Sequence, residues 1–154
     1  MSEDDVAHFL SHWFSGLTKG LENLDAPSRT ILLRECGMAC ARSYTARVFR
    51  ECWQRAGGDM VRFLVELATR FPGATYMQTD DDAIQVRYAA CGCDLVQRGW
   101  VTSPTLCECS AHNLQANFEA ALGKPVMVTL KTSLLRKGEV CVFMVQFVTN
   151  PLLQ

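Results

Sequence analysis

The sequence predicts an α+β domain, in which N-terminal helices pack on a small antiparallel sheet with one long helix in its C-terminal half. Apolar residues recur every three or four positions through residues 1–73, whereas stretches of residues 74–154 alternate apolar and polar residues. A length of 154 residues suits one domain with a sizeable core, and no linker or internal repeat divides it. We therefore expect a single domain, with a helical half at 1–73 and a strand–helix–hairpin half at 74–154.

Four helices are expected in the first half. Ser2 and Asp5 match a capping box before an apolar helical pattern at residues 6–17. Gly16 and Gly20 are expected to end this first helix.

Glycine, proline and aspartate mark the boundaries of the other three helices. Pro27 suits the first turn of the second helix, because its missing N–H is not needed there. The third helix is expected to stop at Gly57-Gly58, and Asp59 to cap a fourth that Pro72-Gly73 ends. This half contains no strand pattern.

The second half combines strands with one helix. Residues 84–88 alternate with the period of a half-buried strand, and residues 114–122 have helical spacing. Residues 126–131 and 140–147 form a predicted hairpin around a turn at 136–139. Its last strand is apolar enough to be buried on both faces.

Charge and hydropathy exclude several classes of function. A net charge of −1 and a pI of about 6.3 lack the excess of basic residues that is typical of proteins that bind nucleic acids or membrane surfaces. The longest apolar run, 140–148, is too short to span a bilayer. Because the N-terminus is acidic where a secretory signal is basic, we expect a cytoplasmic protein, in which thiols stay reduced.

Two Cys-x-Cys pairs are the most distinctive feature among the eight cysteines. Zinc takes about four ligands in a tetrahedron, and thiolates suit it. The spacing departs from the usual Cys-x2-Cys pattern, but Gly92 permits the turn that chelation needs. The candidate zinc ligands are Cys91, Cys93, Cys107 and Cys109. An iron–sulfur cluster that also uses Cys36 and Cys40 is an alternative.

Thiol chemistry is a second interpretation of the same residues. Cys107 and Cys109 precede the predicted helix at 114–122, and a helix N-terminus lowers the pKa of a thiol. His112 lies nearby and makes a Cys–His pair that can activate a nucleophile. Simple packing is the third interpretation, and Cys52 and Cys141 fit it best.

Aromatic and thiol side chains also provide candidates for a ligand pocket. Cys36 and Cys40 are one helical turn apart and share a helix face. Core packing explains each candidate as well. The candidate wall residues are Cys36, Cys40, Trp53 and Tyr88, with Trp13, Phe14 and Phe63 as further aromatic candidates.

From Tyr88 to Phe147 the chain resembles the 4-vinyl reductase domain superfamily of predicted hydrocarbon-binding proteins. The resemblance rests on Cys91-Gly92-Cys93 after a strand, on the helix that leads to Gly123, and on Gly138-Glu139-Val140-Cys141-Val142-Phe143, which looks like the family's Gly-x-x-Cys-x-Phe ending. It implies an apolar ligand pocket, beside which some members hold zinc with cysteines and a glutamate.

Two departures separate this chain from those zinc sites. In those zinc-binding members, which are sensors of aromatic effectors, a Glu-x-x-Cys pair precedes the last cysteine. Leu130 and Ser133 replace that pair here, so Cys141 and one of Cys91 or Cys93 remain. A metal would need a different ligand set, such as one including Cys107 and Cys109.

The same cysteine-rich pattern resembles a bacterial family named L-2-amino-thiazoline-4-carboxylate hydrolase. This resemblance implies an enzyme that hydrolyses a small thiazoline-type carboxylate with a cysteine or a bound metal. Arg87 or Arg98 is then the candidate partner of the carboxylate.

The sequence thus predicts a domain that binds a small apolar or aromatic molecule beside a cysteine-rich site with zinc as the candidate metal. A hydrolase is the alternative. An assembly module is a third class, since related folds pair through their helices into homodimers.

Overall fold

The computed structural model describes residues 1–148; residues 149–154 of the predicted domain lie outside the described part. Helical elements precede, interrupt and link the strands. They are α1 Glu3–Glu22, α2 Ala26–Cys40, η1 Ala41–Thr45, α3 Ala46–Ala56, α4 Met60–Arg70, α5 Asp94–Gln97, η2 Pro104–Leu106, α6 Cys107–Leu122 and η3 Leu134–Arg136.

Four strands form one antiparallel sheet in the order β1-β2-β4-β3. They are β1 Ala74–Asp80, β2 Ala83–Tyr88, β3 Val126–Thr132 and β4 Cys141–Phe147. The α+β class is confirmed, as are the strand at 84–88 and the C-terminal hairpin. β1 was not predicted, because its residues lack a sustained apolar alternation and most of them are exposed.

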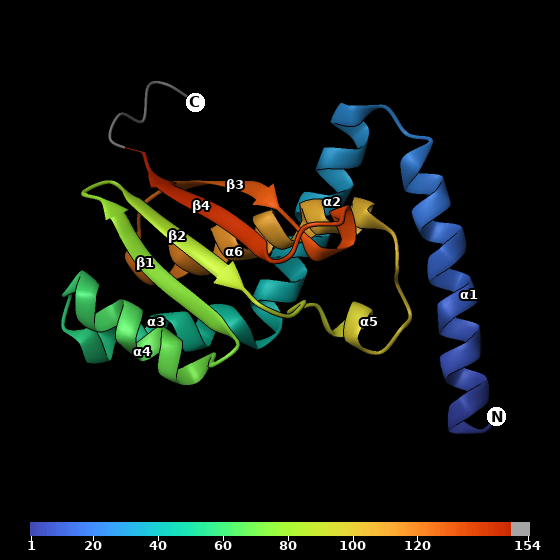
Figure 1. Ribbon diagram of the computed structural model, residues 1–154, viewed down its shortest axis with the longest axis horizontal. Coiled ribbons are helices and arrows are strands. Elements are labelled where there is room, and N and C mark those ends of the chain that lie inside the picture. The colour runs from blue at the N-terminus through green and yellow to red at the C-terminus, as the bar shows by residue number, and fades with distance from the viewer. Residues whose placement is uncertain (149–154) are drawn as a thin grey trace.

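Helices α3, α4 and α6 cover one face of the sheet, whereas α1 stands apart from it (Figure 1). Phe63 and Phe118 are fully buried between these helices and the strands. They join Phe49 in a set of edge-on aromatic contacts, with ring centroids 5.3 to 6.3 Å apart. Edge-to-face pairs of this kind stabilise a core beyond their buried area.

The capping box of α1 is confirmed, since Ser2 Oγ accepts from Asp5 N and the Asp5 carboxylate accepts from Ser2 N. The helix ends two residues beyond Gly20, close to the predicted end. α1 continues through Gly16 and Gly20 to Glu22. An exposed glycine costs a helix only about 0.5–1 kcal/mol, which does not stop one that is otherwise well formed.

The second and third helices form one continuous rod rather than two. Between α2 and α3, η1 is a π-helical turn in which Ala46 N donates to Ala41 O, five residues earlier. The π-helical turn contains one residue more than an α-helical turn would, so the buried positions before and after it both face α6.

Asp25 caps the N-terminus of α2, and Asp59 caps that of α4. The cap by Asp59 was predicted.

α2 crosses α6 at unusually close range. A Cβ added at Gly37 would lie 2.6 Å from Cys109 O and 2.8 Å from Asn113 N, both backbone atoms. Only glycine allows this approach, so the backbones of the two helices are in direct contact.

β4 lies in the interior of the sheet, between β2 and β3. Its Cys141, Phe143 and Val145 are buried beneath the helices, and Val142 and Met144 on the other face are half-buried. Within residues 1–148 no helix combines the length and the apolar character that crossing a bilayer requires.

Candidate functional site

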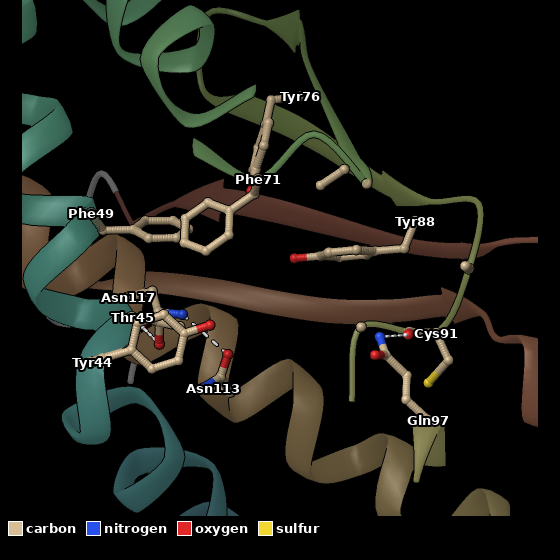
Figure 2. A pocket seen from close by; sticks show the side chains of 14 residues that line it. Tyr44, Thr45, Phe49, Phe71, Tyr76, Tyr88, Cys91, Gln97, Asn113 and Asn117 are labelled. Atoms are coloured by element: carbon tan, nitrogen blue, oxygen red, sulfur yellow. Dashed lines mark hydrogen bonds between the residues drawn. The ribbon is translucent and has the colours of Figure 1, made fainter. Parts of the chain in front are cut away.

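A pocket of about 260 Å³ opens between the rod formed by α2, η1 and α3, the end of β2 and the first half of α6 (Figure 2). Tyr88 extends its hydroxyl into this space, opposite the rings of Phe49 and Phe71. The lining residues are Tyr44, Thr45, Phe49, Phe71, Gly73, Ala74, Tyr76, Tyr88, Ala90, Cys91, Gly92, Gln97, Asn113 and Asn117.

The wall of this pocket carries no charged side chain, within the part of the chain that the structure describes. Burial raises the pKa of Tyr88 to about 12, and burial together with the neighbouring Tyr88 raises the pKa of Tyr76 further. Both phenols are therefore neutral at physiological pH. The pocket presents aromatic surface with neutral hydroxyl and amide groups.

A hydrogen-bonded chain of polar side chains forms one wall. Thr45 Oγ1 donates to Asn117 Oδ1 at 2.9 Å, and Asn117 Nδ2 donates to Asn113 Oδ1 at 3.1 Å. Asn113 Nδ2 is buried and has no partner among the described protein groups. Because Thr45 belongs to η1 and the two asparagines to α6, the chain joins the wide helical turn to the long helix.

The loop after β2 closes the opposite side of the pocket. Gln97 Nε2 donates to Cys91 O at 2.7 Å, which holds the loop against α5. Gly92 lies next to the Tyr88 ring, where an added Cβ would make ordinary contact at 3.5 Å. The loop can therefore approach the phenol without strain.

The structure places the four predicted ligand-binding residues in different environments. Tyr88 lines the pocket. Trp53 instead packs edge-on against Phe63, with ring centroids 5.2 Å apart, at the border of the core. Cys36 and Cys40 are exposed on α2, outside the pocket wall.

The further aromatic candidates lie elsewhere too. Phe63 is a fully buried core residue. Phe14 stacks on Trp100 with ring centroids 6.5 Å apart, and this contact attaches α1 to the loop before η2. Trp13 is 53% exposed on α1.

Apart from Cys52, which is buried in the core on α3, the cysteines lie near the junction of α2, α6 and the loop after β2. Burial and then the nearby thiols of Cys36, Cys40 and Cys93 raise the pKa of Cys109 to about 12. Burial is also the main cause of the raised pKa of Cys91, to which Cys93, Cys141 and Cys107 contribute. All eight cysteines are free thiols.

The predicted zinc ligands Cys91, Cys93, Cys107 and Cys109 share this region without converging on one point. Among residues 1–148, no three side chains of His, Cys, Asp or Glu are arranged to hold a metal ion. In this arrangement the four thiols do not offer zinc a tetrahedral set of ligands. Zinc stays a prediction from the sequence.

The candidate catalytic residues Cys107, Cys109 and His112 lie in the first half of α6. Cys107 and Cys109 occupy the first turn of α6, but burial raises the pKa of both thiols, so the predicted lowering is wrong. Desolvation disfavours the charged thiolate and is the largest cause of the shift at both residues. Burial, and then Arg34, lower the pKa of His112. The thiols and the imidazole are therefore mostly neutral at physiological pH.

The candidate carboxylate partners lie away from the pocket wall. Arg87 is exposed on β2, where its side chain points to the face opposite Tyr88 and Val86. Arg98 places its guanidinium carbon 5.3 Å from the centre of the Trp100 ring. Neither arginine lines the pocket.

Sequence reasoning missed eight polar or aromatic wall residues. Asn113 and Asn117 are four apart on a helix whose buried face also contains Leu114 and Phe118. Asparagines at such spacing beside an apolar stripe are a usable signal for a buried polar network. The missed residues are Tyr44, Thr45, Phe49, Phe71, Tyr76, Gln97, Asn113 and Asn117.

No protein-family model matches this chain, and no curated protein does. Solved structures share its fold, and two of them align over 96% of this chain. The phenol-responsive sensory domain of the transcription activator PoxR, solved with phenol, aligns over 96% of this chain and 75% of its own, with a TM-score of 0.57. A trafficking protein particle complex subunit 3 from Naegleria fowleri, covalently bound to palmitic acid, aligns over 96% and 97%, with a TM-score of 0.56. Each is 11% identical to this chain, so the likeness is one of fold.

Proposed function

We propose that this chain binds a small, neutral, largely aromatic molecule in the pocket between η1, β2 and α6. The observation that carries the proposal is a wall of rings and neutral polar groups without any charge. An ionised ligand would lose hydration there and gain no counter-charge, which is costly. A neutral ring would replace poorly held water and gain contacts with aromatic faces.

The volume of the pocket limits the size of the ligand. A cavity of about 150 Å³ lined by apolar side chains already takes up benzene. The 260 Å³ here exceeds that size, and it falls below the roughly 300–1,000 Å³ of pockets for drug-sized molecules. We therefore expect a single substituted ring rather than a long acyl chain.

Tyr88 is the expected polar contact of the ligand. Its hydroxyl points into the pocket and is neutral, so it can donate to or accept from a ligand hydroxyl or carbonyl. One neutral hydrogen bond contributes about 0.5–1.5 kcal/mol, a factor of roughly 2 to 12 in affinity. The fold likeness to a domain that was solved with phenol supports this choice of ligand class.

The test is calorimetric titration of the whole chain with phenol, toluene and benzoate. We expect phenol to bind most tightly, toluene next and benzoate not measurably. Tyr88→Phe should remove the preference for phenol over toluene while toluene binding stays. If none of the three probes binds at millimolar concentration, or if benzoate binds best, the proposal is wrong.

The titration, together with a turnover assay, distinguishes the proposed binding function from the predicted hydrolase activity. A carboxylate substrate needs a cation, and the nearest candidates, Arg87 and Arg98, lie outside the pocket wall. Arg87→Gln and Arg98→Gln are therefore matched controls, and both should bind phenol like the original chain. Turnover of a thiazoline carboxylate that either change abolishes would favour the hydrolase instead. Elemental analysis of anaerobically purified protein tests the separate zinc prediction.

A homodimer is the partner that α1 supports best. Phe9, Trp13 and Leu17 are 54%, 53% and 39% exposed on one side of a helix that stands apart from the sheet. Acidic residues fill its first turn and Lys19 its last, so antiparallel pairing of two copies would match opposite charges. Light scattering should give a dimer mass for the original chain and a monomer mass for Trp13→Glu. A monomer for both would refute the pairing.

A further inference from the structure

The residues that line the pocket form a buried floor and an exposed rim. Phe49, Ala74 and Asn117 are buried and belong to the floor. Solvent reaches five other lining residues, so these surround the opening through which a ligand would enter. The rim residues are Tyr44, Gly73, Ala90, Gly92 and Gln97.

The side chains of this rim differ greatly in size. Gly73 precedes β1, and Ala90 and Gly92 follow β2, so the segments next to these strands contribute at most a methyl group there. A Cβ added at Gly73 would meet no atom within 4 Å, which leaves open space beside the rim. Tyr44 is the one aromatic side chain of the rim, and Gln97 is its one long polar side chain.

Tyr44 separates the cavity from solvent on the helical side. It belongs to η1 and lines the pocket, yet it is 50% exposed. Figure 2 shows Tyr44 on this side of the pocket and Cys91 with Gln97 on the side of the loop. A ring in contact with both the cavity and the solvent is part of the boundary between them. The position of the Tyr44 ring therefore sets the width of the opening.

The backbone on both sides of Tyr44 is held by its neighbours. Ser43 Oγ donates to Cys40 O at 2.6 Å, and Thr45 Oγ1 donates to Asn117 Oδ1 at 2.9 Å. Exposed side chains change rotamer within picoseconds to nanoseconds. The ring can thus turn over a ligand while η1 keeps its place, so the contact needs no rearrangement of the helix.

We propose that the Tyr44 ring covers the opening of the pocket and restricts the ligand to a single aromatic ring. This inference rests on the proposed function and assigns the size limit of that function to one residue. The volume of about 260 Å³ is that of the pocket with the ring in place, and a cavity of about 150 Å³ already takes up benzene. Removing the Tyr44 ring would therefore make room for a second fused ring.

The ring affects the affinity for small and large ligands in opposite directions. For phenol, the Tyr44 ring adds an aromatic contact, so its loss should weaken binding roughly 2- to 12-fold. For 2-naphthol, the ring is an overpacked neighbour, and its loss should strengthen binding by roughly fivefold or more. The ratio of the two dissociation constants therefore reports on the cover, whereas a general loss of structure would weaken the binding of both ligands alike.

The experiment is calorimetric titration of the full chain and of Tyr44→Ala with phenol and 2-naphthol, two neutral ligands that carry the same hydroxyl. The original chain should prefer phenol, and Tyr44→Ala should prefer 2-naphthol. Tyr44→Phe keeps the ring and should behave like the original chain. Leu32→Ala is the matched control and should change neither affinity, because Leu32 is 48% exposed on α2 and lies outside the pocket wall.

Far-UV circular dichroism of each variant checks that the helices stay formed. The proposal is overturned if the original chain binds 2-naphthol as tightly as phenol, or if Tyr44→Ala leaves the ratio of the two dissociation constants unchanged. In both cases phenol binding itself still supports the proposed function. If phenol binds neither the original chain nor a variant, the proposed function fails, and the size limit fails with it.

Discussion

Replacing Gly37 with alanine probes the contact that holds α2 against α6. The added Cβ would lie 2.6 Å from Cys109 O, 2.8 Å from Asn113 N and 2.8 Å from His112 Cβ. Two of these atoms are backbone, so they cannot rotate away and the helices must separate. Asn113 and Asn117 of α6 line the pocket, and so do Tyr44 and Thr45 of η1, which continues α2, so the separation should also change the pocket.

The magnitude follows from two opposing effects. Overpacking of a close contact costs about 1–3 kcal/mol, and contacts with backbone belong at the upper end. Alanine is favoured over glycine within a helix by about 1 kcal/mol. The net expectation is a loss of roughly 2 kcal/mol in the free energy of unfolding, or a fall of about 4–8 °C in Tm.

Thermal unfolding followed by far-UV circular dichroism measures this change. Gly20→Ala is the matched control, because its Cβ would meet nothing within 4 Å and it also lies within a helix. That change should raise stability by about 0.5–1 kcal/mol. The reasoning is refuted if Gly37→Ala is as stable as the original chain, or if both alanines shift Tm in the same direction.

Three further predictions concern a buried amide, a strained turn and the two pocket phenols. Asn117→Ala leaves Asn113 Oδ1 without its donor and leaves Thr45 Oγ1 with only its longer bond to Ala41 O, so it should cost about 1–3 kcal/mol in urea unfolding; a cost below 1 kcal/mol would contradict the network. Lys137 has a φ of 63°, so Lys137→Gly should stabilise by roughly 0.5–1 kcal/mol, and a lower Tm would argue against strain there. The folded-state pKa values of Tyr76 and Tyr88 lie above the unfolded value of 10.0, that of Tyr88 at about 12. Their contribution to stability is therefore complete below about pH 10 and is lost as pH rises toward 12, which Tm measured across this range would show; an unchanged Tm would contradict the burial of these phenols.

The helical half was readable from the sequence because its boundaries depend on local chemistry. Asp59 caps α4 and Gly57 ends α3 in the left-handed conformation, both as their residue types predict. The π-helical turn η1 was not predictable in this way. It depends on how the buried faces of α2 and α3 pack against α6. Tertiary packing, rather than the local preference of residues 41–45, therefore determines it.

The site was predicted less well than the fold. Tyr88 and Cys91 line the pocket, but the other pocket residues come from segments that the sequence leaves far apart. Cysteine spacing indicated that the thiols gather, and they do so around Cys109. Spacing alone could not show that burial would raise their pKa values, because burial is fixed by tertiary packing.

The wide turn η1 also determines how the chain tolerates a change in length. Arg42 and Ser43 are exposed residues within this turn, and the buried positions on either side, Ala41 and Ala46, are five apart. Deleting either exposed residue would restore an ordinary spacing of four, so the core contacts of α2 and α3 with α6 should survive. The same deletion would draw Tyr44 and Thr45 back from the pocket. A variant one residue shorter is thus expected to fold normally and to accept a larger ring.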